Sequence, residues 1–209
     1  MAMQVVKPQK RGLKTRERLM AVAVKCLVKE GIHGLRYSHI AKQAKIPQAL
    51  MGYHFPNMES LLMAVIQLEL EKLKVASTDA VERNASQPKR ALAAYIRTPF
   101  DLALVDIEFR AVWTAFYHLC TIEPTFANLN LGIRKLGRER ILNLITIVLA
   151  TEGLLVGEEN TSRARLIDLA ASVQAVITGF IVVTATESNA DYRKMSDLAI
   201  ANVFRVLGI

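Results

Sequence analysis

The fold of this chain is decided by residues 31–62, which read GIHGLRYSHIAKQAKIPQALMGYHFPNMESLL. Two short segments of helical length, about 38–44 and 47–53, are joined by a tight turn and flanked by longer segments that can brace them. In the first segment Ile40, Ala41 and Ala44 share one face, and the small Ala41 lets a second helix approach closely. The pattern predicts a helix-turn-helix, which places a short recognition helix in the major groove of DNA.

The second short helix would direct its amino terminus, with free N–H groups and partial positive charge, at the duplex. Its first turn holds Gln48, Ala49 and Leu50, whose side chains would reach base edges in the groove. Residues at the start and on the outer face of the first helix are left free to meet phosphate. These residues are Arg36, Tyr37, Ser38 and Lys42.

The net charge of the chain lies entirely in its first 60 residues. They contain eleven Lys or Arg and three acidic residues, whereas the remaining 149 residues contain sixteen of each sign. Such a surplus suits a polyanion, because neutralising phosphates releases their counterions. Charge alone fits a solvated tail with ordinary surface lysines equally well.

The rest of the chain also divides into helical segments, and no segment alternates as a half-buried strand does. Thr98-Pro99 predicts either a kink or a fresh helix start, and Asp191 is the expected N-cap of the last helix. We therefore predict an all-α protein, with a three-helix DNA-binding domain over residues 1–60 and an antiparallel helical ligand-binding and dimerisation domain over residues 61–209. Helices are expected over about 15–30, 57–83, 106–120, 125–149, 161–187 and 191–207, with a loop over 152–160.

Residues 40–62, IAKQAKIPQALMGYHFPNMESLL, resemble the signature of the TetR family of transcriptional regulators. The resemblance implies that Gln48, Ala49 and Leu50 read bases or line the groove and that Tyr53 and His54 touch the sugar-phosphate backbone. His54 fits a structural hydrogen bond equally well. The matching residues are Ile40, Ala41, Ala44, Ile46, Tyr53, His54, Phe55, Glu59, Leu61 and Leu62.

Three residues depart from that family's pattern. Lys45 stands where a turn glycine is usual, and a positive φ there would cost roughly 1 kcal/mol. Pro47 replaces a Ser or Thr cap, although proline suits the first position of a helix. Met58 replaces a lysine that often contacts phosphate. Lys45 and Pro47 remain among the predicted DNA-contacting residues.

The C-terminal part, through VWTAFYH at 112–118 and the helices that follow, resembles the choline-sensing betaine repressor group of that family. The resemblance implies a small-molecule effector and a two-fold helical dimer interface. An aromatic cluster would line an apolar or cation-binding cavity, or else simply pack the core. That cluster is Phe109, Trp113, Phe116 and Tyr117, and the predicted interface stripe, which also fits ordinary core, is Leu166, Leu169, Val173, Val176, Ile177 and Phe180.

The sequence thus predicts a cytoplasmic DNA-binding regulator that acts as a homodimer on palindromic operator DNA and responds to a small molecule. We expect no catalytic residues or cofactor, because the sequence has no nucleophile–base pair, paired carboxylates or Gly-rich phosphate loop. We expect no metal, because Cys26 and Cys120 lack CxxC spacing and His33, His39 and His54 form no i, i+4 pair. No membrane partner is expected, since no apolar run approaches eighteen uninterrupted residues. The alternatives are an architectural DNA binder without a sensor and a small α-helical enzyme.

Overall fold

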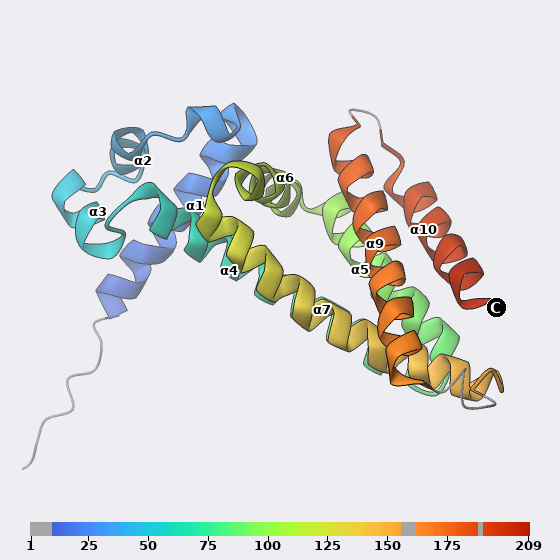
Figure 1. Cartoon of the computed structure of the whole chain (residues 1–209). Coiled ribbons are helices and arrows are strands. Elements are labelled where there is room, and N and C mark those ends of the chain that lie inside the picture. Colours follow the sequence, from blue (N-terminus) through green and yellow to red (C-terminus); the bar gives the residue numbers. More distant parts are fainter. Residues whose placement is uncertain (1–9, 156–161, 188–189) are drawn as a thin grey trace, which may run out of the picture.

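The computed structural model describes residues 10–155, 162–187 and 190–209, and within these ranges all regular structure is helical, which confirms the predicted all-α class. We call residues 10–57 the head and residues 58–209 the body. Figure 1 shows α1 to α3 gathered at one end of the long α4, with α5, α9 and α10 toward its other end. The helices are α1 (Lys10–Glu30), a 3-10 turn η1 (Ile32–Gly34), α2 (Tyr37–Gln43), α3 (Gln48–His54), α4 (Met58–Glu82), α5 (Pro88–Val105), α6 (Ile107–Ile122), α7 (Pro124–Thr151), α9 (Arg163–Thr186) and α10 (Tyr192–Leu207).

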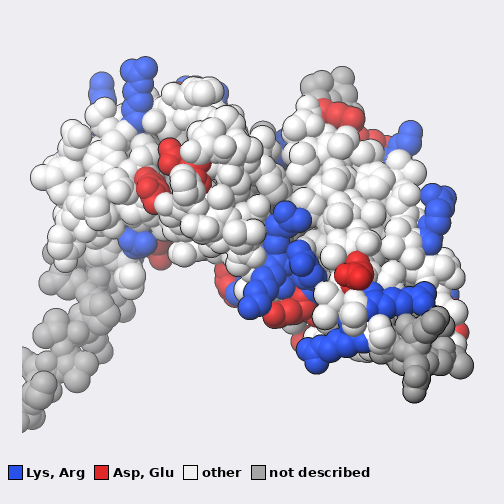
Figure 2. Space-filling view, viewed as in Figure 1, with Lys and Arg blue, Asp and Glu red and all other residues white. Residues whose placement is uncertain are grey.

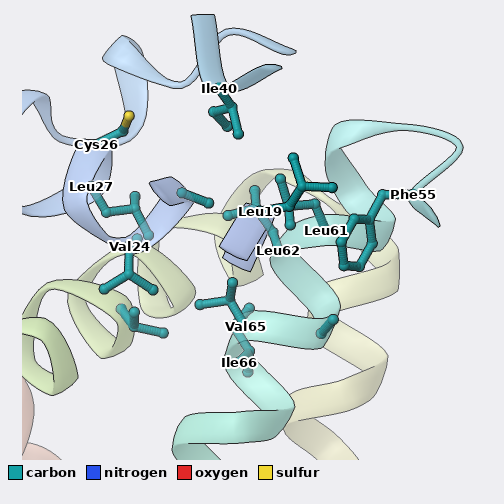
Figure 3. Close-up of a cluster of buried hydrophobic side chains, with 14 of the residues drawn as sticks. Leu19, Val24, Cys26, Leu27, Ile40, Phe55, Leu61, Leu62, Val65 and Ile66 are labelled. Carbon is teal, nitrogen blue, oxygen red and sulfur yellow. The ribbon is translucent and has the colours of Figure 1, made fainter. Parts of the chain in front are cut away.

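The head is built on an apolar core that α1 and the first turns of α4 share with α2 and α3. Leu19, Ile40, Met51, Phe55 and Leu61 are each at most 1% exposed. Figure 3 shows side chains from these helices converging between α1 and α4. Because a fully buried side chain of this size contributes roughly 1.5–3 kcal/mol, this core holds the two short helices in place.

A capping box at Asn57 starts the long helix α4. The Asn57 side chain accepts a hydrogen bond from the Ser60 N–H at 2.8 Å, and the Ser60 hydroxyl accepts one from the Asn57 N–H at 3.3 Å. This reciprocal pair satisfies N–H groups that the helix itself leaves free. The end of α3 and the beginning of α4 are therefore fixed within three residues of each other, as the sequence predicted.

The body has a second apolar core where α5, α7, α9 and α10 meet. Leu92, Ile96, Ile145, Val173 and Val203 come from these four helices, and none is measurably exposed. Their spacing along each helix places one apolar face inward, as expected for antiparallel bundles.

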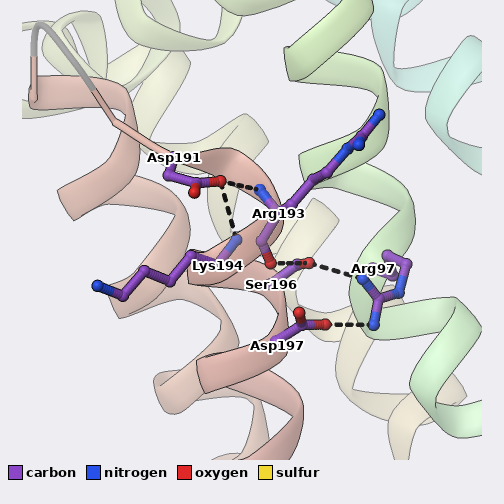
Figure 4. A network of polar contacts seen from close by, with 6 residues as sticks. All are labelled: Arg97, Asp191, Arg193, Lys194, Ser196 and Asp197. Carbon is purple, nitrogen blue, oxygen red and sulfur yellow. Dashed lines mark hydrogen bonds and ion pairs between the residues drawn. The ribbon is translucent and has the colours of Figure 1, made fainter.

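A polar network joins α5 to α10 at the edge of this core (Figure 4). The Arg97 guanidinium forms an ion pair with Asp197 at 2.5 Å and donates to the Ser196 hydroxyl at 3.1 Å. Asp191 accepts from the backbone N–H groups of Arg193 and Lys194, which confirms it as the N-cap of α10.

Helix α6 packs with the head rather than with the second core. Its Val112, Phe116 and Leu119 belong to the same buried cluster as Leu27 of α1 and Ile66 of α4. The apolar core therefore runs across the predicted domain boundary at residue 60. Any movement of α6 would act directly on the helix that supports the head.

Two details differ from the sequence-based expectations. Pro99 does not start a new helix, since α5 continues through it, and the Thr98 hydroxyl donates to the Ala94 carbonyl in the turn before the proline; the alternative, a kink within α5, stays a prediction. The first helix begins at Lys10, about five residues before the predicted start near residue 15.

Candidate nucleic-acid interface and body cavity

Helix α3 is held on the head by its inner side chains and presents a row of outer ones. Met51 is fully buried and Phe55 is 1% exposed, whereas Leu50 is 43% and Tyr53 82% exposed. Gln48, in the first turn of α3 with Leu50, is also exposed. Large apolar and aromatic side chains held outward on a firmly anchored helix are a surface suited to contact with another molecule.

The predicted DNA-contacting residues gather on this outer end of the head, on α2, the turn and α3 (Figure 1). Tyr37 and His54 are partly buried, and the other nine are exposed. Figure 2 shows Lys and Arg side chains projecting from the upper edge of the head in this view. The structure thus places the residues together, and their contact with DNA stays a prediction. The exposed nine are Arg36, Ser38, Lys42, Lys45, Pro47, Gln48, Ala49, Leu50 and Tyr53.

The turn between α2 and α3 depends on a left-handed Lys45. Its φ is +51°, and among the described residues it is the one non-glycine with a positive φ. The Lys45 N–H donates to the Lys42 carbonyl and the Ile46 N–H to the Ala41 carbonyl, both at 3.0 Å, so this backbone conformation closes the end of α2. The condition on which the sequence-based cost depended, a positive φ at this position, is therefore met.

Pro47 precedes α3 instead of occupying its first helical position. The helix begins at Gln48, and Pro47 provides no side-chain hydrogen bond to the first turn, although its carbonyl accepts from the Met51 N–H at 3.0 Å. The first N–H groups of α3 are thus left without a side-chain cap. Met58, the other departure, packs its partly buried side chain against the head core.

The Tyr37 side chain and the His54 backbone carbonyl form hydrogen bonds that hold the head together. The Tyr37 hydroxyl donates to the Phe55 carbonyl, tying α2 to the end of α3. The His54 carbonyl accepts from Arg16 at 3.0 Å, and the Arg16 guanidinium lies 4.1 Å from the Phe55 ring centroid. Sequence reasoning missed Arg16, because nothing distinguishes it from the other basic residues of its segment.

The body contains an apolar hollow of about 480 Å³ between α4, α5, α6, α9 and the start of α10. Three of the predicted pocket residues, Phe109, Trp113 and Tyr117, line it. Phe116 does not, since it is fully buried in the core shared with the head. The sequence did not identify the remaining lining residues, which are Leu73, Pro99, Phe100, Ala103, Arg110, Ile181, Thr184, Ala185 and Tyr192.

The polar groups of this body cavity are few. The Arg110 guanidinium donates to the Ala103 carbonyl at 3.1 Å and lies 5.6 Å from the Tyr192 ring centroid. The Trp113 Nε1 group is buried and has no hydrogen-bond partner. Burial raises the pKa of Tyr117 to about 12, so its hydroxyl stays protonated and remains a donor.

A buried carboxylate, Glu69, lies on α4 one turn before the cavity residue Leu73. Glu69 is 2% exposed and pairs with Lys72 at 2.8 Å, and Lys72 also reaches Asp106 at 3.3 Å. Burial raises the pKa of the Glu69 carboxyl, and its second oxygen has no hydrogen-bond partner. Glu69 is not among the residues that line the cavity.

A second hollow separates the end of α1 from α6, at the junction of head and body. Its lining includes Ile32 and His33 from the head and Arg110, Thr114 and His118 from α6. Arg110 therefore borders both this junction and the body cavity. The two histidine rings meet across the junction with centroids 6.3 Å apart.

The predicted dimer stripe on α9 faces mainly into the subunit. Val173 is fully buried and Ile177 is 8% exposed, both in the body core. The other predicted residues, Leu166, Leu169, Val176 and Phe180, pack partly buried against that core. Val176 and Phe180 also line the surface groove between α9 and α10, so the role of the stripe in a dimer interface stays a prediction.

The exposed face of α9 is also apolar and continues onto α10. Val182 and Val183 are 36% and 45% exposed, and Leu198 and Val206 of α10 are 42% and 39% exposed. Among the described residues, α9 is the single helix long and apolar enough by composition to cross a membrane, yet only 28% of its most apolar stretch is buried. Core helices of soluble proteins meet the same criterion of length and composition. The finding shows that α9 is strongly apolar although much of it is exposed.

Comparison with known proteins identifies relatives of the head in sequence. The sequence pattern described as "Bacterial regulatory proteins, tetR family" matches residues 19–65. The HTH-type transcriptional regulator BetI of Rhizobium meliloti (strain 1021) is 31% identical over 102 residues, covering 49% of this chain and 50% of the relative. BetI of Paraburkholderia phymatum is 25% identical over 114 residues, covering 54% and 58%. This chain therefore spans about half the length of the curated relatives it matches.

Solved structures share the whole fold at low sequence identity. A transcriptional regulator from Pseudomonas aeruginosa PAO1 has a TM-score of 0.74 at 15% identity, covering 98% of this chain and 93% of that one. A regulator from Saccharomonospora viridis, solved in complex with choline, has a TM-score of 0.70 at 16% identity, covering 92% and 96%. At these identities the similarity shows a common fold.

Proposed function

We propose that this chain, which matches the tetR family pattern over residues 19–65 and is similar to BetI, is a homodimeric repressor of the TetR family that binds palindromic operator DNA and responds to a small molecule. In this proposal α3 reads the major groove, α2 and the turn hold phosphate, and the body cavity receives the effector. The protein would act in the cytoplasm. The following observations support each part.

The main support for this proposal is the row of exposed side chains on the outer face of α3. Leu50 and Tyr53 are held outward on a helix whose opposite face is locked by Met51 and Phe55. The surrounding segment supplies the entire net positive charge of the chain. A duplex groove accepts both features, because it offers base edges and methyl groups to the helix and phosphates to the basic side chains.

The exposed apolar face of α9 and α10 supports a homodimer. Gly179 and Val183 from α9 and Met195 and Asn202 from α10 border one shared surface groove. A two-fold axis through such a face would form a four-helix interface and present two copies of α3. Two recognition helices about 34 Å apart reach successive major-groove turns, which a single short helix cannot do.

Helix α6 provides a physical route from effector to DNA. It lines the body cavity with Phe109, Trp113 and Tyr117, and it packs on α1 through the shared core. We propose that effector binding favours a position of α6 and α4 that holds the two heads at the wrong separation. DNA would weaken effector binding to the same extent, typically through a coupling of about 1–3 kcal/mol.

Selection of binding sites from random duplex DNA tests the proposal. The wild-type protein should enrich a palindrome, and Gln48→Ala should weaken binding to it by about 1–3 kcal/mol per half-site and relax the preference at the contacted base pairs. Gln67→Ala is the matched control, since Gln67 is an exposed glutamine on α4, outside the helix-turn-helix. Absence of duplex binding at low salt would refute the proposed function.

The same experiment separates the remaining alternatives. An architectural DNA binder would retain duplex DNA without enriching a palindrome and without any response to an effector. A small α-helical enzyme would give no enriched sequence at all.

A further inference from the structure

We propose that the effector is an apolar organic anion, with a chain about the size of a medium-chain carboxylate, whose acidic head binds Arg110 in the body cavity. This inference rests on the proposed effector response and assigns the chemical class of the ligand. From the sequence alone, the aromatic cluster fitted an apolar cavity, a cation-binding cavity or ordinary core. The present inference differs from the cation-binding interpretation.

The charge of the cavity wall favours an anion. Arg110 is the one charged residue among the twelve that line the cavity, and no carboxylate is among them. In an apolar hollow an unpaired ion is strongly disfavoured, so a cationic ligand beside this guanidinium would meet repulsion without a counter-charge. A carboxylate there would instead form a charge-assisted, bidentate pair.

The unused hydrogen-bonding groups of the wall are also donors. The buried Trp113 Nε1 has no partner, and an indole N–H can only donate. Arg110 spends one N–H on the Ala103 carbonyl at 3.1 Å, and a guanidinium carries five. The Thr184 hydroxyl already donates to the Phe180 carbonyl. The unpartnered N–H groups of Arg110 and Trp113 would match acceptor atoms on a ligand.

The aromatic side chains form a wall and leave little room for a cation. Trp113 is tilted against Phe109 and Tyr117, with ring centroids 5.9 and 6.1 Å apart, so these rings pack on one another. The Tyr192 ring already has the Arg110 guanidinium near it, at 5.6 Å. Glu69 is paired with Lys72 and lies outside the lining, so it does not supply the missing negative charge.

The remaining lining suits the apolar part of such a ligand. Leu73, Phe100 and Ile181 contribute carbon surface around the hollow. A short alkyl or aryl chain would fill this space while its acidic end reached Arg110.

A matched ligand series tests the assignment, and the chain supplies its own reporter. Trp113 is the single tryptophan of the sequence and lines the cavity, so its fluorescence reports directly on occupancy. The intact protein would be titrated with octanoate, octanol and octyltrimethylammonium, each below its micellar range, at pH 7.5 and constant ionic strength. Octanoate should bind at least tenfold more tightly than either of the others. Equal or tighter binding of the ammonium compound would overturn the proposal, as would no binding of octanoate.

Variants then locate the anionic head. Arg110→Gln should lose at least tenfold in octanoate affinity, with octanol affinity unchanged, whereas Arg110→Lys should retain most of the preference for octanoate over octanol. Arg90→Gln is the matched control, because Arg90 is an exposed arginine on α5 outside the cavity. Unchanged octanoate affinity in folded Arg110→Gln would overturn the role of Arg110. If that variant does not fold, unchanged octanoate affinity in folded Arg110→Met, which keeps the length of the side chain without its charge, would do so.

Duplex binding, measured without any ligand, separates this inference from the proposed function. A protein that binds DNA but not octanoate would refute the ligand class and leave the DNA-binding role intact. A protein that binds octanoate but no duplex DNA would refute the proposed function, while the cavity assignment would stand.

Discussion

The apolar side chains of the head lie in two kinds of surroundings, whereas those of α9 in the body lie in three. In the head they fill the core, as Met51 does, or form the outer row of α3, as Leu50 does. Along α9, Val173 lies in the core, Ile181 lines the cavity and Val183 is 45% exposed. The difference teaches that short helices bounded by turn signals fix their own inner face, but a long helix that is apolar all round does not.

The largest expected effect distinguishes the exposed face of α9 from its buried face. Val183→Glu should raise the dissociation constant of the dimer at least 100-fold, about 2.8 kcal/mol, because two-fold symmetry buries two unpaired carboxylates at once. Sedimentation of the variant over a range of concentrations would show monomers where the wild-type protein is dimeric.

Val173→Ala is the matched test of the buried face. Removing two methyl groups from the core should lower the free energy of unfolding of the subunit by about 2 kcal/mol, while the dimer constant stays near the wild-type value. A dimer disrupted by Val173→Ala and unaffected by Val183→Glu would restore the interface predicted from the sequence and contradict the orientation of α9.

A smaller effect is expected in the head, at the turn between α2 and α3. Lys45→Gly should raise the free energy of unfolding by about 1 kcal/mol, because glycine adopts the observed φ of +51° without the steric cost of a Cβ. The same change should weaken DNA binding if Lys45 contacts phosphate. Urea unfolding and a duplex-binding titration measure the two effects separately.

Lys45→Ala separates the backbone effect from the charge. Alanine removes the lysine charge but keeps a Cβ, so this variant should gain no stability and should lose as much DNA affinity as Lys45→Gly. Equal stability of the two variants would show that the left-handed conformation carries no cost at this turn.

The structure of the head could be predicted from the sequence because each of its turns and helix ends depends on residues close together in the chain. The positions of the two short helices, the turn between them and the start of the long helix near residue 57 all follow from residues within a few positions of one another. Met51 and Arg16 were missed, since their roles depend on which neighbours fold against them.

The body was predictable in its helices and not in its surfaces. The helices of α4, α6, α7 and α10 were placed within a few residues, yet Phe116 was assigned to the cavity and lies in the core. Arg110 and Tyr192 come to the cavity from segments about 80 residues apart in sequence, and no local pattern signals such a meeting. The same helical spacing of apolar residues occurs in the core, in the cavity wall and on the exposed face of α9.

Glu69 marks the smallest expected effect and the clearest contrast within a single helix. In the sequence LELEKLK at 68–74, the pairs Glu69–Lys72 and Glu71–Lys74 have the same i, i+3 spacing. The side chain of Glu69 is 3% exposed and that of Glu71 is 62% exposed. Burial raises the pKa of the Glu69 carboxyl. An exposed ion pair such as Glu71–Lys74 contributes little to the stability of the fold.

The sign of the pH dependence follows from that raised pKa. Because folded Glu69 holds its proton to a higher pH than the unfolded chain does, its contribution to stability is full below about pH 4.5 and declines as pH rises through the folded pKa. Glu69→Gln removes this decline, so the variant should gain stability relative to wild type as pH increases from 4.5 to 7.5. Urea unfolding at several pH values measures the difference, and Glu71→Gln, at the exposed pair on the same helix, is the matched control. A difference that shrinks with rising pH would show that pairing with Lys72 outweighs the cost of burying the charge.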